Sequence, residues 1–236
     1  MSAGEGALPR IVVQKFGGTS VATEAQRRAV VERVKEAIAE GLAPVVVVSA
    51  MGRRGDPYAT DTLLDLLPGE GPRPPERELA LLMSVGEVIA IVVLSQALQA
   101  AGIASRALTG AQAGIVTDAN LTAARVLEVR PERVRALCAG GVVPVIAGFQ
   151  GADASGEVTT LGRGGSDTTA AVLGVALNAV RVDIFTDVDG MKTADPRLVP
   201  GAATLSHISY EEAAQMAHLG AKVVHPRAVE AAMQGR

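Results

Sequence analysis

The residues best suited to chemistry lie in three glycine-rich segments, and the first is Lys-Phe-Gly-Gly-Thr-Ser at positions 15–20. Gly17 and Gly18 lack side chains, so their backbone N–H groups can face an anion, and Lys15 adds a full positive charge. A helix that follows directly would add its positive N-terminal end. The segment therefore predicts a phosphate site, although it matches neither G-x-x-x-x-G-K-[ST] nor G-x-G-x-x-G. The alternative is a glycine turn that only tightens strand-to-helix packing.

The second segment, at positions 159–169, reads TTLGRGGSDTT and holds three glycines within four positions around Arg163. An arginine can grip a carboxylate with two parallel hydrogen bonds, which a lysine cannot do. Ser166 or Asp167 is placed to cap the helix expected after it. Asp167 could also pair with Lys15 and aim it. A role for Asp167 in capping alone is the alternative.

The third segment joins Thr186, Asp187 and Asp189 to a loop that contains Lys192 and Arg197. Its acidic residues lack the further carboxylate that a calcium-binding EF-hand loop has at its twelfth position, so calcium is not expected. We expect the loop to hold the ribose, base edge and phosphates of a nucleotide, and a solvated turn is the alternative. Downstream, Lys222 is either a second phosphate contact or an ordinary surface lysine.

Isolated polar residues give weaker signals. Glu87 interrupts the apolar stretch LLMSVGEVIAIVV and must face water, a partner or a ligand, because burying an unpaired carboxylate is costly. The three histidines, His207, His218 and His225, show no zinc-ligand spacing, so no metal site is expected. The single cysteine, Cys138, is expected to be a small buried residue in a protein from a reducing compartment.

The elements that must position these segments alternate along the chain. Nearly continuous apolar runs predict strands buried on both faces, at 11–16, 45–48, 142–147 and 182–185. Helices are predicted at 22–40, 78–101, 131–139, 167–177, 210–218 and 227–233. The first helix should bury a stripe of Val30, Val31, Val34 and Ile38. This pattern predicts an α/β three-layer sandwich with a mostly parallel central sheet, and a proline-rich surface loop at 67–76.

Composition excludes several protein classes. With 48% hydrophobic and 20% charged residues, the 236-residue chain is not expected to be disordered. A formal charge of −3 and 2% aromatic residues argue against nucleic-acid binding. The first ten residues contain no signal peptide, and the strongly apolar run 88–94 is short for a membrane helix. We therefore expect a cytoplasmic protein that binds neither nucleic acid nor membrane.

Seven motifs together resemble the aspartate kinases of the amino acid kinase family, collinearly from Ile11 to Met233. They are KFGGTS at 15–20, SAMG at 49–52, GFQG at 148–151, TTLGRGGSDTTA at 159–170, FTDVDG at 185–190, TADPR at 193–197 and GAKVVHPRA at 220–228. The stretch GRRGDPYATDTLL is most similar to bacterial enzymes of the diaminopimelate and lysine branch. The resemblance implies one catalytic domain over residues 1–236 with the amino acid kinase (carbamate kinase-like) fold.

The resemblance implies transfer of the γ-phosphoryl group of ATP to the β-carboxylate of L-aspartate, with Mg²⁺ carried mainly by the phosphates. Lys15 would bridge the reacting phosphates above Gly17 and Gly18, and Asp167 would orient that lysine. Arg163 would hold the substrate α-carboxylate and Glu87 would lie near its ammonium group. Further substrate-side positions are Ser49, Thr60, Gly164, Gly165 and Ser166. The nucleotide positions are Thr186, Asp187, Lys192, Arg197 and Lys222.

The chain departs from this family at its C-terminal end. Relatives continue with a strand that completes the kinase sheet and with regulatory ACT domains, and their intact forms are expected to be homo-oligomers. The sequence therefore predicts a sheet that lacks an edge strand, and a catalytic domain insensitive to feedback by lysine. Two other readings remain: a superfamily member acting on acetylglutamate, glutamate or a nucleotide, and a silent fragment that only binds nucleotide or a partner.

Overall fold

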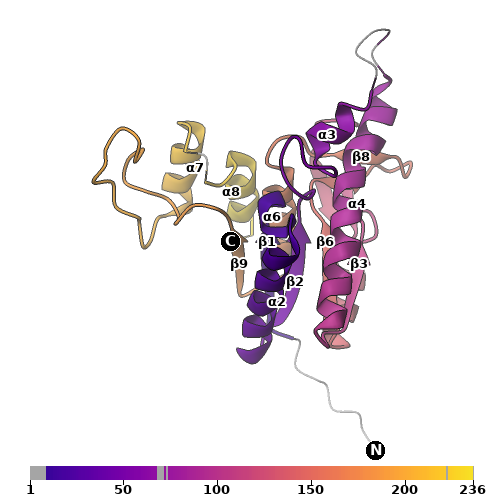
Figure 1. Ribbon diagram of the computed structural model, residues 1–236, viewed down its shortest axis with the longest axis horizontal. Helices are drawn as coiled ribbons and strands as arrows, with labels where there is room; N and C mark the ends of the chain where they lie inside the picture. Colours follow the sequence, from indigo (N-terminus) through magenta and orange to yellow (C-terminus); the bar gives the residue numbers. More distant parts are fainter. Residues whose placement is uncertain (1–8, 68–71, 73, 222, 236) are drawn as a thin grey trace, which may run out of the picture.

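The central sheet contains five parallel strands, in a computed structural model that describes residues 9–67, 72, 74–221 and 223–235 (Figure 1). Their order is β3 (Ser105–Leu108), β6 (Val143–Ala147), β2 (Ala43–Val48), β1 (Ile11–Phe16) and β9 (Arg181–Phe185). The four predicted strands are confirmed, and the sequence missed β3. Because all the strands are parallel, their carboxyl ends meet at one edge of the sheet.

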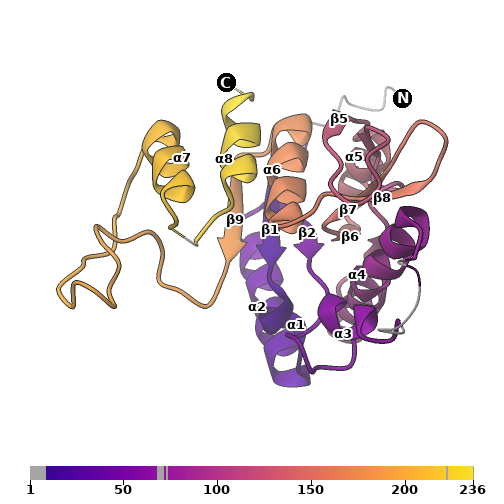
Figure 2. The same ribbon diagram turned by 90° about the horizontal axis from the view of Figure 1, so that it is seen from above.

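Helices cover both faces of this sheet, as Figure 2 shows. On one face, α2 (Glu24–Ala39) and α4 (Glu76–Ala100) pack with Val46, Val48 and Val145 in one aliphatic core. On the other face, α5 (Glu132–Ala139) and α6 (Gly165–Leu177) pack with alternate residues of the same strands in a second core. The predicted three-layer α/β sandwich is confirmed. Cys138 on α5 is buried in the second core, as expected.

The helix predicted at 22–40 is two helices. The four-residue α1 (Gly18–Val21) follows β1, and α2 begins only after a capping box between Thr23 and Gln26. Gly41, with φ of +74°, follows its C-terminal end. The predicted buried stripe is wrong at Ile38, which is 44% exposed, because Ala37 takes the inward position at the end of α2.

A second, four-stranded sheet was not predicted. Its order is β5 (Val126–Val129), β4 (Ile115–Thr117), β7 (Gln150–Ala152) and β8 (Val158–Thr160), with both parallel and antiparallel pairs. These strands have three or four residues each, too few to show an alternating pattern. β8 leads directly into the glycine-rich segment before α6, so this sheet anchors one side of the candidate site.

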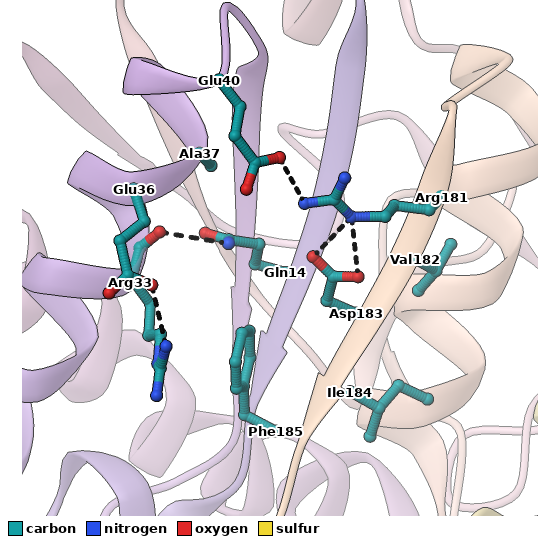
Figure 3. A pocket seen from close by; sticks show the side chains of 10 residues that line it. All are labelled: Gln14, Arg33, Glu36, Ala37, Glu40, Arg181, Val182, Asp183, Ile184 and Phe185. Atoms are coloured by element: carbon teal, nitrogen blue, oxygen red, sulfur yellow. Dashed lines mark hydrogen bonds and ion pairs between the residues drawn. The ribbon is translucent and has the colours of Figure 1, made fainter. Parts of the chain in front are cut away.

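β9 is half-buried, so the prediction that 182–185 is buried on both faces is wrong. Among the described residues, β9 pairs only with β1, and it is therefore an edge strand. A cavity of about 510 Å³ opens between it and α2 (Figure 3). Arg181 crosses the cavity wall to Glu40 at 2.9 Å, and the buried Gln14 Oε1 has no hydrogen-bond partner there.

α4 has 25 residues and a mean hydropathy of 2.1 over its most apolar window, so it is long and apolar enough to cross a membrane. The run 88–94 is only part of this helix, so the expectation that the apolar segment is short for a membrane helix is wrong. α4 packs against β3, β6 and β8, and it carries Ala90, Ile91 and Leu94 into the core. That is the arrangement of a core helix. Before it come α3 (Thr60–Leu64) and the predicted proline-rich loop, which lies partly outside the described residues.

The C-terminal part lies beside the edge strand. Residues 186–209 extend away from the sheet and contain one isolated bridge, between Lys192 and Thr204 (Figure 1). The chain then returns through α7 (Tyr210–His218) and α8 (Pro226–Met233), and α8 packs along α6. Both predicted helices are confirmed. α8 places its first residues next to the glycine-rich turn before α6.

Candidate active site at the carboxyl ends of the strands

Lys15 is the fifth residue of β1, and its side chain points to the face covered by α6. Its Nζ lies 2.7 Å from Asp167 Oδ1, and the two side chains are only 12% and 15% exposed. The contact is an ion pair by distance but is not aligned as a hydrogen bond, because Oδ1 has no hydrogen-bond partner. The predicted pairing of Lys15 with Asp167 is thus present in the structure. A lysine held this way at a strand end presents a fixed positive charge.

Gly17 and Gly18 form the turn after β1. Gly17 precedes α1 with φ of −69° and has no side chain to cap it. Gly18 is enclosed by the loop after β2: a Cβ there would collide with the Ala50 carbonyl oxygen and lie 2.8 Å from that of Gly52. The Gly52 N–H donates to the Gly18 carbonyl at 3.0 Å. The two loops therefore form one unit beside Lys15.

The glycine-rich segment before α6 supplies Arg163 and Asp167. Gly164 has φ of +73° and is the residue that precedes the helix, so the prediction that Ser166 or Asp167 caps it is wrong. α6 begins two residues earlier than predicted because the left-handed glycine makes the turn. Asp167 thus lies inside the first helical turn, free to face Lys15. Arg163 is exposed in the turn itself.

Gly165 and Ser166 are buried at the start of α6. Ser166 packs against Gly148, where a Cβ would lie 2.7 Å from the Ser166 hydroxyl oxygen. The loop after β6 is therefore in contact with the first turn of α6. Ser166 is held under the turn, while Arg163 points outward.

Glu87, Ser49 and Thr60 line one cavity of about 230 Å³ together with Gly18 and Arg53. Glu87 Oε1 accepts the Ala50 N–H at 2.9 Å, and Oε2 has no hydrogen-bond partner. Burial raises the pKa of the Glu87 carboxyl to about 8, although the hydrogen bond from Ala50 acts in the opposite direction. The structure thus brings the predicted substrate-side residues of α3, α4 and the β2 loop around one cavity next to Gly18.

The predicted nucleotide residues divide between two cavities. Lys192 and Arg197 line a largely apolar cavity of about 670 Å³ beside α7. Thr186 and Asp187 line a different one, on the α2 side. Lys222 lies outside the described residues.

The charges of this region are paired locally. Lys192 Nζ lies 3.1 Å from Asp189 Oδ2, and Arg197 lies 2.7 Å from Asp195. The hydrogen bonds from Arg197 lower the pKa of the Asp195 carboxyl to about 2. A bound nucleotide would therefore compete with carboxylates for these two cations.

Two residues near the site were missed by the sequence analysis. Arg53, in the loop after β2, forms an ion pair of 2.6 Å with Asp187, in the loop after β9. Because β1 lies between β2 and β9, this pair joins the loops on both sides of the strand that carries Lys15. The place of Arg53 in the loop after a buried strand could have marked it. His225 lies against Gly164, so a Cβ at that glycine would overlap its ring. No pattern of metal ligands marked this histidine.

Comparison with known proteins agrees with this arrangement. The model of the family described as "Amino acid kinase family" matches residues 10–236. The chain belongs to the amino acid kinase family. Aspartokinase 1 of Bacillus subtilis is 52% identical over 227 residues, which are 96% of this chain and 56% of that protein. The aspartokinase of Thermus thermophilus is 47% identical over 93% of this chain and 53% of its own length.

Solved structures of the family have the same fold. The aspartate kinase of Synechocystis matches with a TM-score of 0.79 at 46% identity. The match covers 94% of this chain and 36% of the Synechocystis chain. E. coli aspartokinase III in complex with aspartate and ADP matches with a TM-score of 0.80 at 28% identity. The match covers 95% of this chain and 60% of the E. coli chain. The chain therefore spans about half the length of the curated relatives it matches.

Proposed function

We propose that this domain transfers the γ-phosphoryl group of ATP to the β-carboxylate of L-aspartate, giving 4-phospho-L-aspartate and ADP. The observation that carries the proposal is the Lys15–Asp167 ion pair at the end of β1, one loop away from the Glu87 cavity. A cation and a substrate-sized polar cavity are thus adjacent at the edge of the sheet where α/β proteins bind ligands. The names of the relatives support the same activity.

The substrate needs no general base. A free aspartate side chain has a pKa of about 3.9 and is already ionised at neutral pH. The difficulty is that a carboxylate must approach a polyphosphate, so catalysis depends on positioning and on neutralising charge. Lys15 would contact the reacting phosphates, with Asp167 holding its orientation, and the N–H groups of Gly17 and Gly18 would donate to them.

We propose that L-aspartate is held by its α-substituents, which leaves the β-carboxylate free to react. Arg163 would bind the α-carboxylate with two parallel hydrogen bonds, since this residue is exposed in the turn before α6. Binding of the ammonium group would favour the ionised form of Glu87, and the unpartnered Oε2 would then accept a hydrogen bond from it. Ser49 and Thr60 line the same cavity and would complete it. Gly164, Gly165 and Ser166 would provide the backbone of the turn that carries Arg163.

The nucleotide would lie along the loop after β9. The apolar walls of the Lys192 and Arg197 cavity suit an adenine ring. Thr186 and Asp187 begin the same loop and line a second cavity with Thr19 and Ser20 of α1. Among the described residues, no three His, Cys, Asp or Glu side chains form a group able to hold a metal. Phosphate oxygens and water would therefore be the main ligands of Mg²⁺, which when bound neutralises phosphate charge.

The test is ADP release by this 236-residue chain, measured with L-aspartate, L-glutamate and acetylglutamate as acceptors. We expect release that depends on L-aspartate and exceeds that with either other acceptor. Nucleotide binding without acceptor-dependent ADP would refute the proposal and favour a silent binding domain. The expected cytoplasmic location, single domain over 1–236, and homo-oligomeric state of the intact relatives stay predictions.

A further inference from the structure

His225 contacts the glycine-rich turn that carries Arg163. The residue precedes α8, and its ring covers Gly164 so closely that a Cβ on the glycine would overlap it. Gly164 already needs a glycine for its φ of +73°. The ring therefore packs directly against the turn.

A second contact ties the start of α8 to the same turn. Arg227 Nη1 donates to the Leu161 carbonyl at 3.1 Å, so the two contacts lie on either side of Arg163. The Arg227 N–H in turn donates to His225 Nδ1 at 3.4 Å. With Nδ1 accepting, the ring proton is on Nε2. Residues 225–227 thus brace the turn at both of its ends.

We propose that His225 is a positioning residue, which holds the 161–167 turn so that Arg163 faces the substrate and Asp167 faces Lys15. It acts through the backbone of Gly164 and does not touch the substrate. The inference rests on the proposed function for its activity readout. The bracing of the turn by the ring is a structural claim that can be tested without that function.

The protonation state of the ring should matter. Burial lowers the pKa of His225, and the charges of Arg227 and Arg163 act in the same direction, while Asp167 and Glu230 oppose them. The ring is therefore neutral at neutral pH and can accept the Arg227 N–H. Protonation would turn that acceptor into a donor and add a cation beside Arg163. The turn should loosen only below pH 6.5, the ordinary pKa of the ring.

Three variants test the proposal: His225→Ala, His225→Asn and the control His218→Asn. Asparagine keeps an acceptor for the start of α8 but removes the ring from Gly164. His218 is an exposed histidine on α7, 3.0 Å from Glu230. We expect kcat/KM for L-aspartate to fall on the order of 10- to 100-fold in His225→Ala, and several-fold in His225→Asn. The control should match the wild type.

The pH profile and amide exchange give two further readouts. In the wild-type and control proteins, kcat/KM should fall below pH 6.5, and in both His225 variants this acid-side fall should be absent. Any change caused by Glu87, whose pKa is about 8, would lie at higher pH and can be distinguished from it. Gly165 and Thr168 N–H donate to Gly162 and Gly164 across the turn, at 3.0 and 3.1 Å. Their hydrogen exchange should be faster in both His225 variants than in the control.

The proposal is overturned if His225→Asn keeps wild-type kcat/KM, pH profile and exchange. It is also overturned if His225→Ala lowers the melting temperature but, below that temperature, keeps wild-type kcat/KM, pH profile and hydrogen exchange. If His225→Ala does not fold, His225→Asn decides. If the wild type shows no aspartate-dependent turnover, the proposed function fails, and exchange at Gly165 and Thr168 still decides whether the ring braces the turn.

Discussion

The buried carboxyl of Glu87 should make the stability of this domain depend on pH. Burial raises its pKa in the folded protein from an ordinary 4.5 to about 8, because the backbone hydrogen bonds from Ala50 and from Glu87 itself offset only part of the lost hydration. Between these two values the unfolded chain has lost the proton and the folded domain has kept it. The free energy of unfolding therefore falls as pH rises from 4.5, and the loss is complete above the folded pKa.

The size of the effect follows from the same shift. Each pH unit in this window costs about 1.4 kcal/mol, so Glu87 alone should remove about 3 kcal/mol of stability between pH 5 and pH 7. In Glu87→Gln, the amide keeps the shape and the acceptor for Ala50 but does not titrate. The free energy of unfolding of Glu87→Gln, relative to the wild type, should therefore rise by about 3 kcal/mol over this range.

Urea unfolding at pH 5, 6, 7 and 8, without substrate, measures this difference. The control is Glu132→Gln, on the first turn of α5, where the residue is exposed. Its curve should run parallel to that of the wild type at every pH. A Glu87→Gln curve that is also parallel to the wild type would refute the reasoning, because it would mean that Glu87 titrates equally in both states.

Two further predictions concern packing and burial. Gly18→Ala should lower the free energy of unfolding by about 1–3 kcal/mol, because the added Cβ would collide with the Ala50 carbonyl oxygen. At Gly17 there is room for a Cβ, which would lie 3.8 Å from Lys15 Nζ. Gly17→Ala should unfold like the wild type, and equal midpoints for the two variants would contradict this account. Burial raises the pKa of the Cys138 thiol to about 11, so it should react with a thiol reagent at pH 8 only after unfolding. Rapid labelling of the folded protein would show that the thiol is accessible.

Long apolar runs made the central sheet predictable from the sequence. The strands at 11–16, 45–48 and 142–147 are continuous apolar runs because helices bury both of their faces. The second sheet could not be predicted, because its three- and four-residue strands are defined by their partners. β9 looked like a central strand by composition, and its place at the edge depends on the topology.

The candidate site was predictable where a single residue breaks a local pattern. Glu87 stood out as a carboxylate in an apolar helix, and Lys15 as a cation ending an apolar strand. His225 could not be found this way, because its partner Gly164 is distant in sequence and the contact is with the backbone. Arg53 likewise meets Asp187 across 134 residues. Such pairs follow from the order of the strands.

The most direct test of the central claim is to trap the product. An acyl phosphate formed on the aspartate side chain reacts with hydroxylamine to give a β-hydroxamate and inorganic phosphate. Simple ATP hydrolysis releases inorganic phosphate but forms no hydroxamate. We expect the wild-type chain to form hydroxamate only with both ATP and L-aspartate. Lys15→Met should form none while keeping the wild-type circular dichroism spectrum. Hydroxamate formation by Lys15→Met at a near wild-type rate, or its absence with the wild type, would contradict the account.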